Sequence, residues 1–267
     1  MHKNRFLTLL SDFGLRDVYV GVMKGVIAQI NSSLTIVDLT HQIPPQHIAA
    51  ARFSLMTAYP HFPAGTVHVA IVDPGVGTQR RAIAVEIANG FLVGPDNGLF
   101  SGVLNQTKAI AAVELTNSKY WLTPKPSATF QGRDIFAPAG AHLASGVALA
   151  ELGQAIDPTT LLQFPVPECT QTDANITGCI QYIDHFGNLV TNIPGTYVAD
   201  RTWSVKTGKL HIPGQQTYSD VQPGSPLALI GSHGWVEIAV DSGDAQFQLR
   251  MDWGDPVEIL LDTETKS

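Results

Sequence analysis

The stretch FLTLLSDFGLRDVYVGVMKGVIAQINSSLTIVDL, residues 6–39, decides the fold class. Its first five residues, Phe6–Leu10, form an apolar run that is typical of a buried strand. Asp17 can cap a helix that runs to about Ile30, because valine or isoleucine recurs at every fourth position along it. A second strand is predicted at Thr35–Leu39. A strand, a helix and another strand in this order indicate an α/β domain with a parallel sheet.

The same alternation continues to about residue 145. The pattern predicts helices at 47–59, 98–104 and 135–145 and strands at 66–72, 82–87, 90–93 and 111–115. Asn89-Gly90 joins two of these strands, and this dipeptide favours a tight hairpin turn. The first part of the chain is therefore predicted to be an α/β domain with a largely parallel central sheet.

The pattern changes after two proline-containing stretches, Asp157-Pro158 and Pro165-Val166-Pro167, which are typical of a linker. Beyond them the helical period is lost, and turn residues separate short apolar runs. Strands are predicted at 178–184, 189–192, 203–206, 209–212, 227–230, 235–240 and 257–261. We therefore expect an N-terminal α/β domain over residues 1–168 and a C-terminal all-β, barrel-like domain over residues 169–267.

Composition restricts the class of protein. The chain has 267 residues, 44% of them hydrophobic, which is enough for sizeable cores. Its net charge is −7 and no cluster of Lys and Arg stands out, so we expect no nucleic-acid partner. No apolar run is long enough for a signal peptide or a membrane span, so we expect no membrane association and a cytoplasmic location. Cys169 and Cys179 form no CxxC pair, so a structural zinc site is not expected. Two reduced, buried thiols are expected, with a disulfide between them as the alternative.

Three aspartates follow predicted strands of the first domain. Asp12 follows the first strand within Ser-Asp-Phe-Gly, Asp38 lies at the end of the second, and Asp73 follows the third. The carboxyl ends of strands in an open parallel sheet frame the ligand crevice, so these aspartates predict a site. Asp73 opens Asp-Pro-Gly-Val-Gly, where two glycines let a ligand approach the backbone. A role in turns or helix caps is the alternative for each aspartate taken singly.

Other candidates are weaker alone. Arg80 lies seven residues after Asp73 and would stabilise its ionised form, unless it is simply exposed. Phe130 can stack on a flat ligand or fill the core. Asn188 suits an adenine edge or a hairpin turn. Ser232 and His233, in Gly-Ser-His-Gly, can hold a carboxylate or form another turn.

Six segments in order give a specific signal. The chain resembles the S-adenosylmethionine hydroxide adenosyltransferase family, relatives of the fluorinase and chlorinase enzymes. The matching segments extend over residues 7 to about 245 and are residues 10–14, 38–41, 72–78, 94–98, 129–134 and 183–188.

The resemblance implies a two-domain subunit that assembles as a homotrimer, with each active site between one N-terminal domain and a neighbour's C-terminal domain. The resemblance implies Asp12 for the ribose diol, Phe186 and Asn188 for the adenine with backbone from Val240 to Ser242, and Asp184, Ser232 and His233 for the methionine part. Phe130 is expected as a further substrate contact.

The family's water-orienting group is an Asp-Arg-His triad. Asp73 and Arg80 match its first two members, and Gln131 stands where the family usually carries His. A glutamine donates and accepts hydrogen bonds, so it can orient water, but it cannot take a proton. Gln46 and His47 also replace a pair that is usually aromatic and acidic.

The resemblance implies hydrolysis of S-adenosyl-L-methionine (SAM) to adenosine and L-methionine, with water attacking the ribose C5′. SAM is then the substrate, and no cofactor or metal is expected. A halide transferase that forms a 5′-halo-5′-deoxyadenosine is one alternative, which the Asp73 carboxylate disfavours because it repels a halide. A metal-dependent phosphoesterase built on Asp12, Asp38, Asp73 and Asp96 is another. A non-catalytic protein that binds SAM or adenosine is the third.

Overall fold

A computed structural model describes residues 6–208 and 210–261 of the chain. The chain divides into two compact units, Met1–Pro165 and Val166–Ser267, and each is described by itself.

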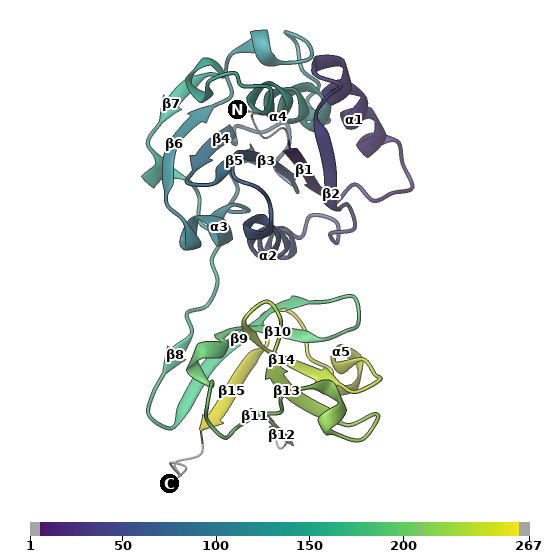
Figure 1. The fold of residues 1–267 in the computed structure, drawn as a ribbon, viewed down its shortest axis with the longest axis vertical. Coiled ribbons are helices and arrows are strands. Elements are labelled where there is room, and N and C mark those ends of the chain that lie inside the picture. The colour runs from purple at the N-terminus through teal and green to yellow at the C-terminus, as the bar shows by residue number, and fades with distance from the viewer. Residues whose placement is uncertain (1–5, 209, 262–267) are drawn as a thin grey trace. The chain divides into compact units, whose positions relative to one another are not determined.

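The N-terminal unit is built on a seven-stranded sheet with the strand order β2-β1-β3-β5-β4-β6-β7 (Figure 1). Its strands are β1 (Phe6–Ser11), β2 (Thr35–Thr40), β3 (Thr66–Ile71), β4 (Ala82–Ile87), β5 (Gly90–Pro95), β6 (Ala109–Glu114) and β7 (Gln154–Ile156). The pairs β1–β2, β1–β3 and β3–β5 are parallel. The pairs β4–β5, β4–β6 and β6–β7 are antiparallel. The predicted α/β class is confirmed, and the sheet is mixed because the hairpin at Asn89-Gly90 reverses the chain between β4 and β5.

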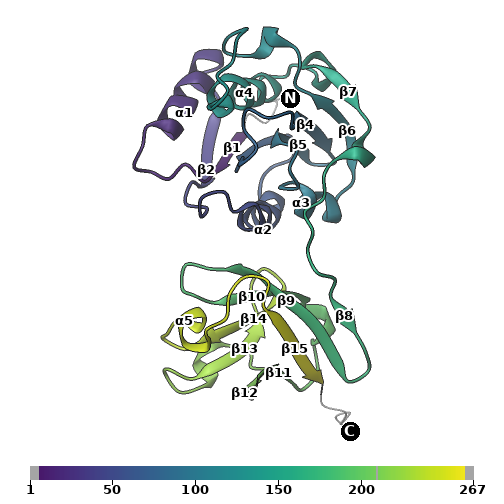
Figure 2. The ribbon, with the colours of Figure 1, turned by 180° about the vertical axis from the view of Figure 1, so that it is seen from behind.

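Helices cover both faces of this sheet. The helices are α1 (Tyr19–Ile30), α2 (Ile48–Ala58), α3 (Ser101–Gln106) and α4 (Ala137–Ala144). Figures 1 and 2 show α1 and α4 on one face and α2 and α3 on the other. Strand β3 is buried along its whole length, as expected for a strand that is covered on both faces. Leu7 and Leu9 of β1 and Val67 and Val69 of β3 lie in one apolar core cluster with residues of α4.

Two sequence predictions about helix starts are corrected. Asp17 does not cap α1, because the N-cap residue is Val18 and no side chain bonds the first turn. The helix that was predicted to begin at Ile135 begins at Ala137. A π-helical turn, Gly132–Phe136, precedes α4, and Asp134 lies inside it with its carboxylate bound to Arg133 and to the Ser127 N–H. Single π-helical turns are frequent at functional sites, since they re-aim nearby side chains.

The C-terminal unit is an antiparallel, nearly closed β-barrel, which confirms the predicted class (Figure 2). The strand path is β12-β11-β15-β9-β10-β14-β13, with β8 pairing with β9. Its elements are β8 (Thr170–Gln171), β9 (Asn175–Ile183), β10 (Leu189–Pro194), β11 (Trp203–Thr207), β12 (Leu210–Pro213), β13 (Pro226–Ile230), β14 (Trp235–Val240), β15 (Pro256–Leu261) and the short helix α5 (Ala245–Leu249). An isolated bridge between Gly214 and Ala228 brings the end of β12 to β13 and nearly closes the barrel.

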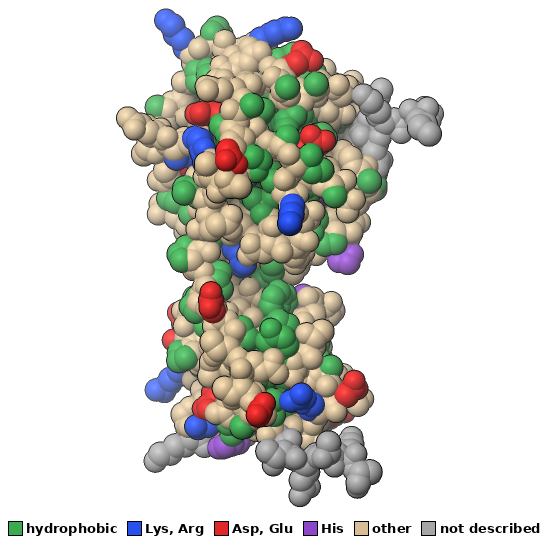
Figure 3. Space-filling model, turned by 90° about the vertical axis from the view of Figure 1, so that its left-hand side faces the viewer, with side chains coloured by type: hydrophobic (Ala, Val, Ile, Leu, Met, Phe, Trp, Pro, Cys, Tyr) green, Lys and Arg blue, Asp and Glu red, His purple; other side chains and the backbone are tan. Residues whose placement is uncertain are grey.

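The strand that was predicted over 209–212 begins at a position outside the described residues, and its described part matches β12. No described helix is both long and apolar enough to cross a membrane. On the face drawn in Figure 3, the Lys and Arg side chains of described residues are scattered and do not form one patch.

Candidate active site

The parallel pairing of β1 with β3 sets Asp12 and Asp73 at one edge of the sheet. Ser11 and Ile71 pair at the ends of the two strands, and the aspartates follow one and two residues later. Both aspartates line a cavity of about 370 Å³. The cavity is also lined by Phe13, Tyr19, Gln46, Ile71, Pro74, Val76, Thr129, Phe130, Gln131 and Gly132. The structure thus brings four predicted site residues of this unit, Asp12, Asp73, Phe130 and Gln131, to one hollow.

Arg80 joins the two sides of this cavity. Its Nε lies 3.0 Å from Asp73 Oδ1, its terminal Nη2 donates to Asp73 Oδ2, and the same nitrogen lies 2.5 Å from Gln131 Oε1. The side chains of Asp73 and Arg80 are only 7% and 11% exposed. The Arg80 guanidinium also lies over the Phe136 ring, 5.2 Å from its centre. The predicted trio is therefore a connected, nearly buried hydrogen-bonded group.

The guanidinium decides which way the Gln131 amide faces. Arginine has only donors, so the atom that faces Arg80 is the amide oxygen. The Gln131 NH₂ group is then the part of the amide that can donate to a molecule in the cavity. A histidine at this position would offer an ionisable ring nitrogen instead.

The loop after Asp73 needs glycine for close approach. Gly77 has a φ of +80°, and a Cβ there would lie 2.7 Å from the Ala128 carbonyl oxygen. This contact packs the loop against the segment that leads to Phe130 and Gln131. Gly77, one of the two glycines that the sequence singled out, thus lets two parts of the cavity wall lie beside one another.

Asp12, which also lines the cavity, is held by a backbone hydrogen bond. Its Oδ2 accepts the Gln46 backbone N–H at 2.8 Å, and Gln46 has an unusual φ of +64°. A non-glycine residue in this region is rare and marks a constrained loop. Phe13 and Tyr19 were not predicted as site residues, because their segments indicate only a loop and a helix start. Gln46 was noted in the sequence only because it replaces one member of a pair that the family usually conserves in type.

Three aromatic rings form one cluster in the cavity. Phe13, Tyr19 and Phe130 have ring centres 5.1–5.8 Å apart in tilted or edge-to-face arrangements. Such contacts fix ring orientation and bury apolar area. The Arg133 guanidinium lies 5.3 Å from the centre of the Phe130 ring. Phe130 therefore lines the cavity as part of a packed wall.

The four carboxylates of the phosphoesterase alternative have separate partners. Asp38 pairs with Lys24 at 2.5 Å, and Asp96 pairs with Arg81 at 2.5 Å. Burial raises the pKa of Asp38, but the neighbouring Lys24 and His41 side chains outweigh it and hold that pKa below its usual value. Within residues 6–208 and 210–261, no group of three or more His, Cys, Asp or Glu side chains is placed to hold a metal ion.

In the C-terminal unit, Asp184 organises the predicted adenine loop. Its Oδ1 accepts the backbone N–H groups of Phe186 at 2.8 Å and of Asn188 at 2.9 Å, and its Oδ2 accepts from the Asn188 side chain at 3.0 Å. Asn188 is buried, whereas Phe186 is 72% exposed. An exposed phenylalanine on an ordered loop is a candidate contact for an apolar ligand or a partner chain.

A second segment lies directly against this loop. Gln246 donates its backbone N–H to the Gly187 carbonyl at 2.9 Å, and a Cβ on Gly187 would meet the Asp244 carboxylate at 2.2 Å. Ser242, two residues before Asp244, has a φ of +56°. The fold therefore places the Val240–Ser242 segment next to Phe186 and Asn188, although about 50 residues separate them in the chain.

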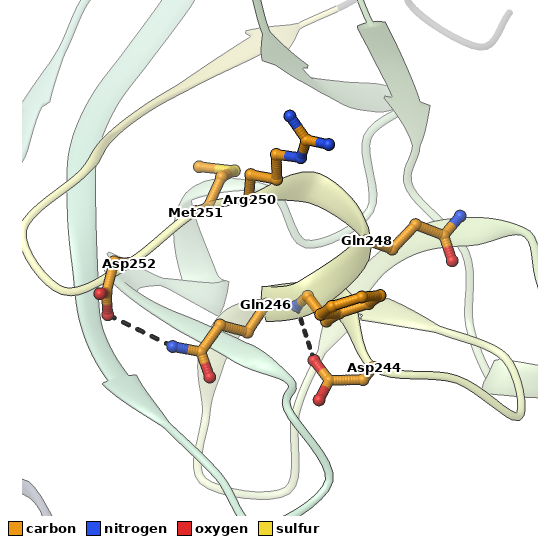
Figure 4. Close-up of a pocket in the computed structure, with 7 residues that line it drawn as sticks. Asp244, Gln246, Gln248, Arg250, Met251 and Asp252 are labelled. Carbon is orange, nitrogen blue, oxygen red and sulfur yellow. Dashed lines mark hydrogen bonds between the residues drawn. The ribbon is translucent and has the colours of Figure 1, made fainter.

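A larger hollow of about 800 Å³ surrounds the short helix α5. Figure 4 shows Gln246 and Asp252 pointing toward one another, while Arg250 points away from them. The polar groups drawn there do not converge on one point. We therefore place the candidate site at the cavity between Asp12 and Asp73, where the polar groups do converge.

His233 is held through both ring nitrogens. Its Nε2 lies 3.1 Å from Glu237 Oε2, and its Nδ1 accepts the Trp235 backbone N–H at 3.2 Å. The other Glu237 oxygen accepts from Tyr218 at 2.8 Å, and burial together with this bond raises the pKa of Tyr218. A Cβ on Gly231 would lie 2.4 Å from the His233 ring, so only glycine fits there. Ser232 is exposed beside this network. Glu237 was not predicted as a contributor, because it appears as one more residue of a predicted strand.

Comparisons with known proteins agree with this architecture. Residues 7–153 match the model of the SAM hydroxide adenosyltransferase N-terminal domain, and residues 178–258 match the model of the C-terminal domain of the same family. The chain is 39% identical over 255 residues to the (R)-S-adenosyl-L-methionine hydrolase of Salinispora tropica, covering 95% of this chain and 97% of that protein. It is 38% identical to the protein of the same name from Thermus thermophilus, covering 94% and 98%.

More distant relatives and a solved structure fit the same picture. The chain is 30% identical to a fluorinase from Actinoplanes, covering 88% of this chain and 91% of that protein. The crystal structure of an uncharacterized conserved protein from Thermotoga maritima superposes with a TM-score of 0.89 at 34% identity, covering 95% and 99%. With both domains matched in order over most of its length, the chain belongs to the SAM hydroxide adenosyltransferase family.

Proposed function

We propose that the chain hydrolyses SAM to adenosine and L-methionine, with Asp73, Arg80 and Gln131 positioning the attacking water. The family and the hydrolase names of relatives at 38–39% identity support the reaction. The observation that carries the proposed mechanism is the bridge that Arg80 makes between Asp73 and Gln131 at the cavity wall.

The chemistry of SAM limits what the protein must supply. Sulfur carries a positive charge, so methionine leaves as a neutral thioether with the electron pair of the C–S bond and needs no general acid. Water attacks C5′ in line with that bond. The main tasks are to orient the water, which lowers the entropic cost of the reaction, and to exclude other solvent, which removes solvation from the reacting groups.

The three residues suit these tasks. The Asp73 carboxylate accepts a hydrogen bond from the water and takes its proton as the C–O bond forms. The Gln131 NH₂ group donates to the oxygen of this water. With both hydrogen bonds made, the direction of the water's remaining lone pair is fixed. Arg80 binds both side chains and so holds them at a constant separation.

The substrate contacts are divided between the two units. We propose that Asp12 binds the ribose diol, with Phe130 beside it, and that Asn188, Phe186 and the backbone of Val240 and Ser242 bind the adenine. Asp184 and Ser232 would bind the amino and carboxylate groups of the methionine part. Since both nitrogens of His233 have partners, His233 would act by fixing the hairpin that carries Ser232.

A site of this kind needs both units. We propose a homotrimer in which the N-terminal unit of one chain and the C-terminal unit of its neighbour form each site, as the resemblance implies. Light scattering of the purified chain tests this, and a monomeric mass with full activity contradicts it. The name of the Salinispora and Thermus relatives specifies the (R) form of SAM, so we also propose that the chain prefers the (R)-sulfonium epimer, which turnover of the separated epimers measures.

The decisive experiment is incubation of the full chain with SAM in ¹⁸O-labelled water, followed by mass analysis of the adenosine. Label at the 5′ oxygen, with an equal amount of methionine, supports the proposal. A parallel incubation with chloride separates the halide transferase alternative, since a 5′-chloro product contradicts hydrolysis as the activity. Protein that binds SAM and releases no methionine over hours would be a binding protein instead.

A further inference from the structure

We propose that His41 is a positioning residue that holds the Ser11–Gly14 loop, so that the Asp12 carboxylate faces the ribose diol. This inference rests on the proposed role of Asp12 in the proposed function. It concerns a histidine outside the cavity lining, which the proposed chemistry does not use.

His41 contacts the loop on both sides of Asp12. Its side chain is buried, and its Nδ1 lies 2.7 Å from the Oγ of Ser11, the last residue of β1. Its backbone carbonyl accepts the Gly14 N–H at 2.7 Å. Ser11 and Gly14 flank Asp12 in the chain, so a single residue bonds both ends of this short turn.

The hydrogen-bond pattern assigns the protons in this group. Asp38 Oδ1 lies 3.1 Å from His41 Nε2, and a carboxylate beside this nitrogen favours the tautomer with its proton on Nε2. In that tautomer Ser11 Oγ donates to His41 Nδ1 and accepts the Phe13 N–H at 3.3 Å. The contact between Nε2 and Asp38 is off the line of a good hydrogen bond and acts electrostatically. Asp38 in turn pairs with Lys24, which keeps a negative charge beside Nε2 and favours this tautomer.

The consequence falls on Asp12. One of its carboxylate oxygens is already bound to the Gln46 N–H at 2.8 Å, so the direction of the other oxygen depends on the backbone of the turn. A side chain misplaced by about 1 Å loses much of its contribution to binding and orientation. His41 therefore affects ligand binding through Asp12 and not by contact.

The chain supplies a matched control for a purely structural role. His68 on β3 is as buried as His41, at 2% exposure each, and its Nδ1 bonds Thr8 Oγ1 at 2.8 Å. Thr8 lies on the same strand as Ser11 but three residues away from it, within the sheet. Both pairs join a buried histidine to a hydroxyl of β1, and only one of them reaches the Asp12 turn.

Three variants at the site and one control test the proposal. In His41→Asn the amide lies where Nδ1 was and can still accept from Ser11, whereas in His41→Gln it lies near Nε2 and cannot. Ser11→Ala removes the same bond from the other side. His68→Gln removes the control bond. Each full-length variant is assayed at pH 8 for KM, kcat and melting temperature.

A second readout does not require turnover. The affinity for adenosine is compared with that for 2′,3′-dideoxyadenosine, which lacks the diol. We expect His41→Gln and Ser11→Ala to raise the KM for SAM about tenfold with kcat changed less than threefold, and to lower the adenosine preference by a similar factor. His41→Asn should stay within about threefold of wild type, and His68→Gln should lower only the melting temperature.

The proposal is overturned if His41→Gln and Ser11→Ala lower the melting temperature as His68→Gln does and leave KM and the diol preference unchanged. It is also overturned if the wild type does not distinguish adenosine from the dideoxy compound. A wild type that binds adenosine with diol preference and yet releases no methionine from SAM contradicts the proposed hydrolysis alone. If His41→Gln does not fold, the Ser11→Ala variant decides by the same criteria.

Discussion

Replacing Asp73 by Asn tests the proposed mechanism most directly. The substitution keeps the size and shape of the side chain and removes its charge and its ability to take a proton. In the structure, both carboxylate oxygens of Asp73 accept from Arg80, so an amide NH₂ at this position would face a donor. The water would lose its anionic acceptor, and Arg80 would keep Gln131 and at most the single amide oxygen at position 73 as partners.

The magnitude follows from these contacts. Loss of a positioned base costs about 10²–10⁴ in rate, which corresponds to ~3–5 kcal/mol of barrier. Substrate contacts from Asp12 and from the C-terminal unit are unchanged, so KM should change less than about threefold. Stability should fall by about 1–3 kcal/mol, less than for a fully enclosed pair, because the Asp73–Arg80 pair borders an open cavity.

The assay needs a control that separates catalysis from stability. Asp96 and Arg81 form a second buried carboxylate–guanidinium pair in the same unit, with bonds at 2.9 and 2.5 Å, and Asp96 does not line the cavity. Asp96→Asn should therefore lose a similar amount of stability and keep kcat within about threefold. Initial rates of methionine release and urea unfolding are measured on both variants beside the wild type.

Two results would refute this reasoning. Turnover of Asp73→Asn at the wild-type rate would show that no acceptor at position 73 is required. An equal loss of kcat in Asp73→Asn and Asp96→Asn would assign the effect to stability. A parallel rise of KM and fall of kcat in Asp73→Asn alone would indicate a role in substrate binding.

Three further predictions concern Gln131, His68 and metal dependence. Gln131→Leu should lower kcat about 10–100-fold, because the NH₂ group that donates to the water is lost. Gln131→His should raise kcat, since a ring nitrogen can also take a proton. Steady-state kinetics in which the leucine variant has the kcat of the wild type would contradict this. Burial lowers the pKa of His68 from 6.5 to about 4, so between these pH values the unfolded chain binds a proton that the folded chain does not. The free energy of unfolding should therefore fall by about 3 kcal/mol from pH 6.5 to pH 4. Urea titrations of His68→Gln at several pH values should lack this part of the pH dependence. The same pH dependence in the variant and in the wild type would contradict the assignment to His68. Turnover should be the same with and without EDTA, because Asp12, Asp38 and Asp96 are each bound to separate partners, and a loss that Mg²⁺ or Mn²⁺ restores would favour the phosphoesterase alternative.

Much of the fold could be predicted because it rests on local patterns. The apolar runs of β1 and β3, the four-residue spacing in α1 and the Asn89-Gly90 turn are set by neighbours within a few residues. Helix starts were less predictable. Asp17 has the right residue type for a cap, but α1 begins one residue later than such a cap would place it, at Tyr19, with Val18 at the N-cap position and no capping side chain.

Likewise, only some residues of the candidate site could be predicted from the sequence. Motif order pointed to Asp12, Asp73 and Gln131, and the parallel register of β1 and β3 explains why the two aspartates share one edge. Gln46, Glu237 and His41 were not predicted as contributors, since their importance comes from partners 34, 19 and 30 residues away.

By itself, the sequence determined which residue types are present, the α/β and all-β character of the two parts, and membership of a family through six ordered motifs. Only the tertiary structure decided that the sheet is mixed, that a π-helical turn follows Gln131, and that Arg80 fixes the direction of the Gln131 amide across 51 positions of chain. The reason is physical. Periodicity and turn propensity act between near neighbours, whereas hydrogen-bond direction and burial depend on which distant segments the packed core brings together.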